Sequence, residues 1–194
     1  MKTSSLKRRF IIFAIIIIIP IATSNIISLI IGRKINENYN SMQSKMSTTN
    51  EIKGLINDSF NYFNQYIQNN SLDSKKLYDD SYNKALNNVK MLQSNSDLNS
   101  RYILRDLLNS LNTFKDSGDG TIKKYDLHGG IDTYYSDYLA TKEFLSYCST
   151  FISKLSDSYL TYNNEVYAGL KDKEKYIYKI LSIYIITAVL ISII

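Results

Sequence analysis

Apolar residues gather in two stretches, one at each end of this 194-residue chain. The first, residues 10–31, contains no charge and exceeds the roughly 20 residues that a helix needs to cross a bilayer. Pro20 and the polar residues 23–25 lie in its middle, which permits a kink and predicts a membrane helix that packs against a second helix. The second stretch, residues 177–194, would reach about 27 Å and is expected to be an incomplete span.

A secretory signal peptide is the alternative interpretation of the first stretch. Lys2, Lys7, Arg8 and Arg9 would form its basic region, and Ala22 to Ser24 would offer a cleavage site. The apolar sequence continues to Ile31, however, and is longer than the apolar region of a signal peptide. The pattern therefore favours a retained membrane helix.

Between the two ends, apolar residues recur at alternating steps of three and four, the spacing of bundled or coiled helices. This segment has no proline, which also favours long helices. The stripes are Ile35, Tyr39, Met42, Met46, Thr49, Lys53, Ile56, Phe60, Phe63 and Ile67; Tyr78, Tyr82, Ala85, Val89 and Leu92; Leu104, Leu107, Leu111 and Phe114; and Ile131, Tyr134, Tyr138, Thr141, Leu145, Cys148, Ile152, Leu155, Tyr159, Tyr162 and Val166.

The helix boundaries follow from local signals. Asp73 or Ser74 is expected to cap the second helix, and the third is expected to begin after residues 94–97. Residues 115–130 contain four glycines and several aspartates, which predicts a loop before the fourth helix.

Four amphipathic helices bury their stripes by packing against one another. The predicted fold is therefore all-α: an antiparallel four-helix bundle, anchored in the membrane between two transmembrane helices. Because the first and last helices are much longer than the middle pair, we expect a two-helix stalk below the bundle. That stalk would pair with the stalk of a second chain to form a homodimer.

The formal net charge of +5 is a signal of membrane topology. Between Arg33 and Lys175 the chain carries 18 basic and 18 acidic residues, interspersed, which argues against a nucleic-acid partner. The excess lies mainly in the basic tail 1–9 (Lys2, Lys7, Arg8, Arg9) and predicts a cytoplasmic N-terminus. The chain is thus expected to be a multi-pass protein of the cell membrane with an extracytoplasmic domain over residues 32–176.

Few residues suggest chemistry. His128 lies near Asp126 and Asp132, and Asp116, Asp119 and Gly120 superficially resemble a calcium loop, but neither group has the spacing of a metal site. Cys148 falls on the apolar stripe of the last helix, which predicts a buried, unreactive thiol. The sequence predicts no catalytic, cofactor-binding or metal-binding residue, and no enzyme within these 194 residues.

The 17 tyrosines leave two interpretations open. Their helical spacing favours core packing with the hydroxyl at the rim of the bundle, and the alternative is a ligand pocket between helices. The tyrosines concerned are those of the last helix, Tyr134, Tyr135, Tyr138, Tyr147, Tyr159, Tyr162, Tyr167, Tyr176 and Tyr178. Lys53, Arg105 and Lys142 are expected to extend to solvent. The alternative is that they lie near a helix interface and bind an anion.

The basic tail, the first span around Pro20 and the helical run that follows, residues 7–35, resemble bacterial membrane sensor histidine kinases of the YesM type. The resemblance implies that a cytoplasmic linker and kinase follow the second span, so that Ile194 is not the natural end. The signal would come from an unknown ligand or a binding protein and pass to the kinase by displacement of the last helix, with Gly169 as the compliant point. A response regulator would receive the output.

Two other classes share this layout. A methyl-accepting chemoreceptor has a similar exterior domain, and a membrane-anchored interaction protein would lack any signalling output. Only the cytoplasmic sequence separates these classes from a kinase.

Overall fold

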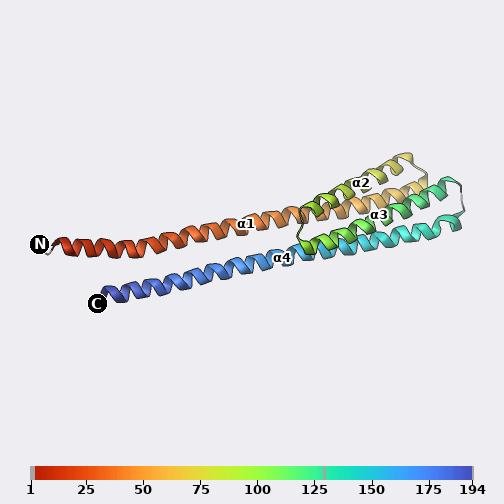
Figure 1. The fold of residues 1–194 in the computed structure, drawn as a ribbon. Coiled ribbons are helices and arrows are strands. Elements are labelled where there is room, and N and C mark those ends of the chain that lie inside the picture. Colours follow the sequence, from red (N-terminus) through yellow and green to blue (C-terminus); the bar gives the residue numbers. More distant parts are fainter. Residues whose placement is uncertain (1–2, 129, 194) are drawn as a thin grey trace. The chain divides into compact units, whose positions relative to one another are not determined.

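The computed structural model describes residues 3–128 and 130–193, and these residues form an all-α fold (Figure 1). Its helices are α1 (Thr3–Asn69), α2 (Leu72–Ser94), α3 (Leu98–Asp126) and α4 (Ile131–Ile193). The prediction that the first and last helices outrun the middle pair is confirmed, since α1 and α4 have 67 and 63 residues against 23 and 29.

The chain divides into two compact units. The bundle unit, Met42–Thr161, contains α2, α3 and the adjoining parts of α1 and α4. The paired-helix unit consists of Met1–Ser41 and Tyr162–Ile194. The bundle unit thus lies within the predicted exterior segment, residues 32–176.

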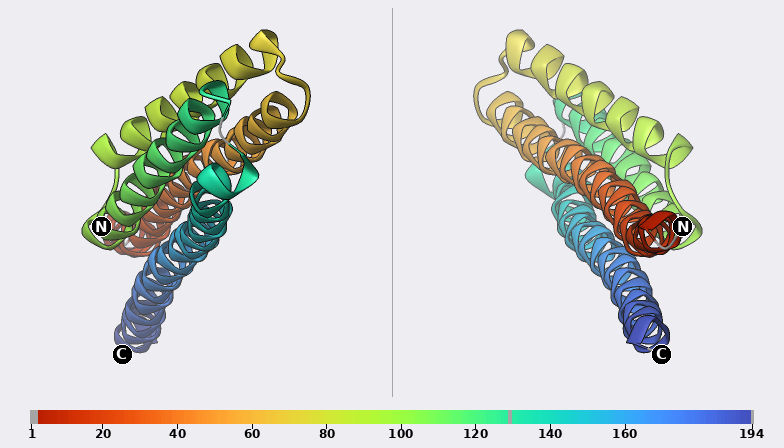
Figure 2. Two further views of the ribbon diagram at one scale, coloured as in Figure 1. Left: turned by 90° about the vertical axis from the view of Figure 1, so that its right-hand side faces the viewer. Right: turned by 90° about the vertical axis from the view of Figure 1, so that its left-hand side faces the viewer.

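The bundle unit has a continuous apolar core to which all four helices contribute. The predicted stripes of α2 and α3 are buried throughout, and that of α4 is buried at Thr141, Cys148, Ile152, Leu155 and Tyr159. Figure 2 shows α2 and α3 lying side by side, and the four helices pack in a bundle-like manner.

Lys53, which interrupts the predicted apolar stripe of α1, is exposed. Ile52, Ser59 and Tyr66 take the buried positions, while Phe60 and Ile67 pack at the edge of the core. A lysine ammonium is costly to bury without a partner, whereas moving one position along the helix places an isoleucine inside.

The caps agree in part with the prediction. α3 begins at Leu98, directly after residues 94–97 as predicted, and its N-cap is Asp97, whose side chain accepts a hydrogen bond from the Ser100 amide at 2.9 Å. For α2 the predicted caps were wrong, because Ser71 is the N-cap and accepts from the Ser74 amide. Asn70, just before it, has a φ of 51°, the left-handed conformation that asparagine tolerates.

The predicted loop over residues 115–130 was largely wrong, because α3 continues to Asp126. Gly118 is buried against Tyr78, and a Cβ placed there would overlap the Tyr78 hydroxyl and lie 3.2 Å from its Cζ. Thr121 and Ile122 extend the buried stripe of α3, so packing outweighs the helix cost of about 1 kcal/mol per glycine. Among the described residues of the remaining connection, His128 has a positive φ, at 56°.

Polar contacts join the two helices of the paired-helix unit. The Ser28 and Tyr178 hydroxyls are 2.7 Å apart, and Asn38 Nδ2 donates to Asn163 Oδ1 at 2.9 Å. Ser24 and Ile31 are buried, but most apolar side chains of residues 10–31 are exposed. α1 runs through Pro20 without ending.

One helix of the described residues is long and apolar enough to cross a membrane, judged by length and composition: the part of α1 that begins at Phe13. This agrees with the predicted first span, although the side chains of Lys2 and Arg9 lie outside the described residues. The second span, 177–194, stays a prediction, and the side chains of 191–194 also lie outside the described residues.

Candidate functional site

The residues first considered for metal or nucleophile chemistry are not assembled into a site. Asp126 bonds to Tyr66 and Lys75, while His128 is exposed. The described residues contain no group of three or more histidine, cysteine, aspartate or glutamate side chains placed to hold a metal. Cys148 is fully buried, as predicted, and burial raises the pKa of its thiol to about 12.

The tyrosines of α4 were predicted mainly for the core, and for most of them this was wrong. Tyr159 is buried and Tyr134 and Tyr138 are half-buried, whereas the remaining six are exposed. Lys53, Arg105 and Lys142 are exposed, as expected. Sequence reasoning missed the buried Tyr66 of α1, whereas the buried Tyr78 and Tyr82 of α2 lie on a predicted stripe.

Polar and aromatic groups gather at one end of the bundle unit, where the α1–α2 and α3–α4 connections lie (Figure 1). Tyr66 donates a hydrogen bond of 2.5 Å to Asp126 Oδ1, and Lys75 Nζ lies 2.9 Å from Asp126 Oδ2. The same ammonium is 5.2 Å from the centre of the Tyr66 ring. We call Tyr66, Lys75 and Asp126 the loop-end cluster.

The contacts of the loop-end cluster change the pKa values of Tyr66 and Asp126. Burial, followed by the hydrogen bond to Asp126, raises the pKa of Tyr66 to about 12. The hydrogen bond from Tyr66, followed by the contact with Lys75, outweighs partial desolvation and lowers the pKa of Asp126. At neutral pH Tyr66 is therefore a neutral phenol and Asp126 a carboxylate, and the contacts of the cluster tie α1, α2 and α3 together.

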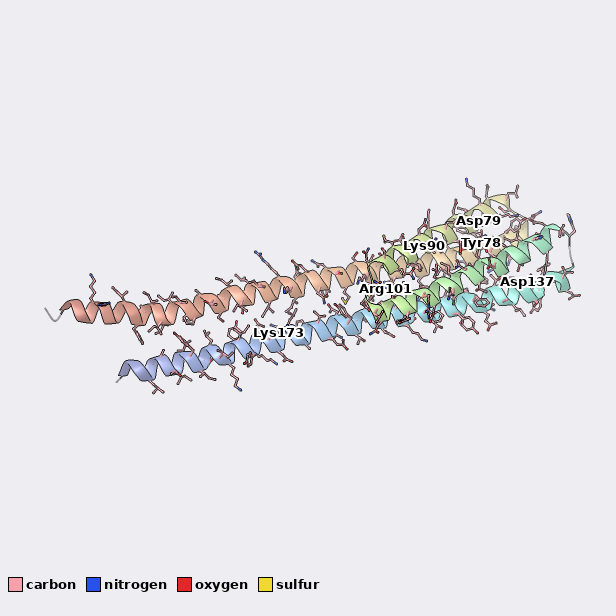
Figure 3. The ribbon with its side chains drawn as sticks, viewed as in Figure 1. Tyr78, Asp79, Lys90, Arg101, Asp137 and Lys173 are labelled. Atoms are coloured by element: carbon pink, nitrogen blue, oxygen red, sulfur yellow. The ribbon has the colours of Figure 1, made fainter. Side chains whose placement is uncertain are left out.

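Lys115 of α3 occupies a second polar site. Its ammonium is 2.8 Å from Asp79 Oδ1, also pairs with Asp119, and lies 4.6 Å from the Tyr78 ring centre. Figure 3 marks Tyr78 and Asp79 on α2. Burial strongly raises the pKa of Tyr78, which keeps this phenol neutral. With only 17% of the Lys115 side chain exposed, its charge is held by protein groups.

A cleft of about 570 Å³ between α2 and α3 runs past both polar sites. Its lining residues are Lys75, Asp79, Lys115, Asp119, Ile122, Lys123, Asp126 and Leu127. Lys75 and Lys115 already pair with carboxylates across it. A charged ligand would have to displace these pairs.

A smaller groove of about 160 Å³ lies between the last turns of α1 and the first turns of α4. We call it the tyrosine groove; its lining residues are Asn64, Ile67, Gln68, Ile131, Tyr134, Tyr135 and Tyr138. Asn64 Oδ1 is buried and has no hydrogen-bond partner among the described groups. One sequence signal could have revealed this groove: three tyrosines lie within five residues at the start of a helix.

Ring contacts connect the tyrosine groove with the core and with the loop-end cluster. Tyr138 stacks on Phe63 with ring centres 5.8 Å apart. Tyr134 meets Tyr125 edge-on at 5.9 Å, and Tyr125 meets Tyr66 in the same way at 5.8 Å. The walls of the groove are thus fixed by packing that reaches other helices.

No family model matches the sequence, and no curated protein matches it. A solved structure described as the XylFII-LytSN complex contains a chain that matches with a TM-score of 0.60 and 38% identity. The match covers 61% of this chain and 98% of that one. LytSN is the N-terminal sensor domain of the histidine kinase LytS.

The chain belongs to the N-terminal sensor regions of histidine kinases. The predicted relation to sensor kinases is confirmed at this level, while the finer assignment to the YesM type stays a prediction. In a sensor region the relevant chemistry is recognition, which agrees with an arrangement of grooves and interhelical polar contacts.

Proposed function

We propose that this chain is the extracytoplasmic sensing and transmembrane signalling module of a two-component histidine kinase. The observation that carries the proposal is the 38% identity with a chain of the XylFII-LytSN complex over 98% of that chain. A cytoplasmic kinase joined after the second span would provide the output and phosphorylate a response regulator.

The proposed topology has a cytoplasmic N-terminus, spans at 10–31 and 177–194, and residues 32–176 outside the cell membrane. Its support is the basic tail together with the exposed apolar side chains of both segments. Phe10 is 73% exposed and Ile183 is 57% exposed, and lipid is the natural environment for such surfaces.

We further propose that the bundle is antiparallel, in up-down-up-down order. Lys75 near the start of α2 pairs with Asp126 at the end of α3, and Lys124 near that end pairs with Asp137 near the start of α4. Such an order suits short connections between neighbouring helices.

Signalling in this proposal is a shift of α4 relative to α1. A ligand or partner bound to the bundle unit would favour one of two packings of these helices, and α4, unbroken from Ile131 to Ile193, would carry the difference. Gly169 is the expected point of compliance, because nothing lies within 4 Å of its missing Cβ. A parallel homodimer would present two such helices to the kinase.

The partner is proposed by analogy. The matched structure is a complex of LytSN with XylFII, so a binding protein is a reasonable source of the signal here, beside a ligand bound directly. A chemoreceptor or an anchored interaction protein would use a similar layout, but the match to a kinase sensor domain favours the kinase.

The test is to determine the reading frame that follows the codon of Ile194 and to map topology with reporter fusions at residues 5, 100 and 194. A kinase core in frame and an exterior position for residue 100 are expected. A methylatable coiled coil would replace the kinase by a chemoreceptor, and a cytoplasmic position for residue 100 would overturn the proposed topology.

A further inference from the structure

The tyrosine groove differs in chemistry from the α2–α3 cleft. Six charged side chains line the cleft, whereas the described lining of the groove consists of tyrosines, two amides and two isoleucines. A charged ligand would lose its hydration in the groove without gaining a counter-charge. The lining therefore selects a neutral molecule.

Asn64 supplies a second requirement. Its Oδ1 is buried with no donor among the described groups, and a buried acceptor without a donor is destabilising. A small rotation of the amide would turn this oxygen toward the groove that Asn64 lines. A ligand that carries an N–H or O–H group would satisfy it.

The volume limits the size of that ligand. The groove has about 160 Å³, close to the roughly 150 Å³ of an engineered cavity that accepts benzene. Tyr134 and Tyr138 present aromatic surface, which favours the apolar face of a ring. One six-membered ring therefore matches the space and its walls.

We propose that the tyrosine groove binds a neutral, single-ring small molecule through its apolar face and a hydrogen bond donated to Asn64. Tyr135, which is exposed, forms the rim and covers the bound ring. The bound ligand would contact Tyr134. Tyr134 packs edge-on against Tyr125, and Tyr125 packs in turn against Tyr66 of the loop-end cluster. The consequence for signalling rests on the proposed sensor function, but binding itself does not.

The test uses three matched probes on the full 194-residue chain in lipid nanodiscs, with binding followed by saturation-transfer NMR. The probe 2-piperidone is neutral, has one six-membered ring and carries an N–H donor. N-methyl-2-piperidone lacks the donor, and piperidine is protonated at neutral pH. We expect 2-piperidone to bind at least about tenfold more tightly than either, the factor that corresponds to one hydrogen bond.

Two leucine variants separate the site from nonspecific binding. Asn64→Leu removes the acceptor and should weaken the binding of 2-piperidone at least about tenfold. Asn61→Leu makes the same change at an exposed position of α1 and should leave binding unchanged. Thermal unfolding followed by circular dichroism checks that both variants fold, and Tyr135→Ser tests the rim in the same assay.

Equal binding of 2-piperidone to the Asn64→Leu and wild-type chains, or no binding to the wild type, would overturn the proposal. In either case Asn64 Oδ1 would accept a hydrogen bond from water only. Because this assay needs no kinase, its failure leaves the proposed sensor function standing. A chain that binds 2-piperidone but proves to have no kinase in frame would instead reject the sensor function alone.

Discussion

The bundle unit and the paired-helix unit use similar residues in opposite ways. In the bundle unit, side chains from four helices enclose one apolar core, and the polar clusters lie at its edge. In the paired-helix unit, two helix segments meet through single polar pairs such as Ser28 with Tyr178, while their isoleucines remain exposed. Two helices cannot enclose a core in water, whereas lipid would remove that need. The comparison shows which part of the chain stabilises itself.

The largest expected effect is a cavity in the bundle core. Phe63 is fully buried and contacts the rings of Phe60, Tyr78 and Tyr138, so Phe63→Ala should lower the free energy of unfolding by about 3–5 kcal/mol. Leu29→Ala, at a position 68% exposed, should change it by less than about 0.5 kcal/mol. Unfolding of the chain in detergent micelles, followed by circular dichroism, measures both. Comparable losses would remove the distinction between the units.

Replacing glycines by alanine should change the free energy of unfolding in opposite directions at buried and at open positions. Gly118→Ala should destabilise the bundle by about 1–3 kcal/mol, because the methyl group would collide with Tyr78. Gly54→Ala and Gly169→Ala meet nothing within 4 Å and should stabilise their helices by about 0.5–1 kcal/mol. Adding Tyr78→Phe to Gly118→Ala should restore part of the loss. If the double variant is no more stable than Gly118→Ala alone, contact with the Tyr78 hydroxyl does not cause the destabilisation.

The loop-end cluster should give a smaller, pH-dependent effect. Asp126→Asn weakens the contacts with Tyr66 and Lys75 and should cost about 0.5–1 kcal/mol at pH 7, given the partial exposure of the pair. Because folding lowers the pKa of Asp126 below its ordinary 3.8, its contribution is complete above that pH and lost as pH falls through the folded-state pKa. Denaturation curves at several pH values should therefore converge for the two chains in acid. A constant difference at all pH values would contradict this origin.

The smallest effect belongs to the paired-helix unit. Ser28→Ala and Tyr178→Phe each remove one hydroxyl of a 2.7 Å pair. Because the pair is exposed, a double-mutant cycle should give a coupling of about 0.5 kcal/mol, the low end for one hydrogen bond. Ser182→Ala is a suitable control, since that hydroxyl bonds to the backbone of its own helix. A coupling of zero would show that the two hydroxyls do not interact.

Much of the fold could be predicted because helical bundles leave a clear periodic signal. The stripes of α2 and α3 and the middle of α4 were predicted correctly, since almost every step of three or four returned an apolar residue. Around Lys53 the pattern permitted two neighbouring stripes, and only the cost of burying the ammonium selects the one through Ile52. The candidate site was less predictable. Its parts, Asn64 and Tyr134, lie on different helices about 70 residues apart along the chain.

The sequence by itself determined the all-α class, the two apolar ends and the order of the helices, because these depend on local propensity and on the period of the hydrophobic pattern. Tertiary structure decided where α3 ends, since the burial of Gly118 against Tyr78 carries the helix through a stretch whose composition suggested a loop. It also decided which tyrosines are buried and which line a groove. These features depend on the surface that neighbouring helices present, and local sequence carries no record of that surface.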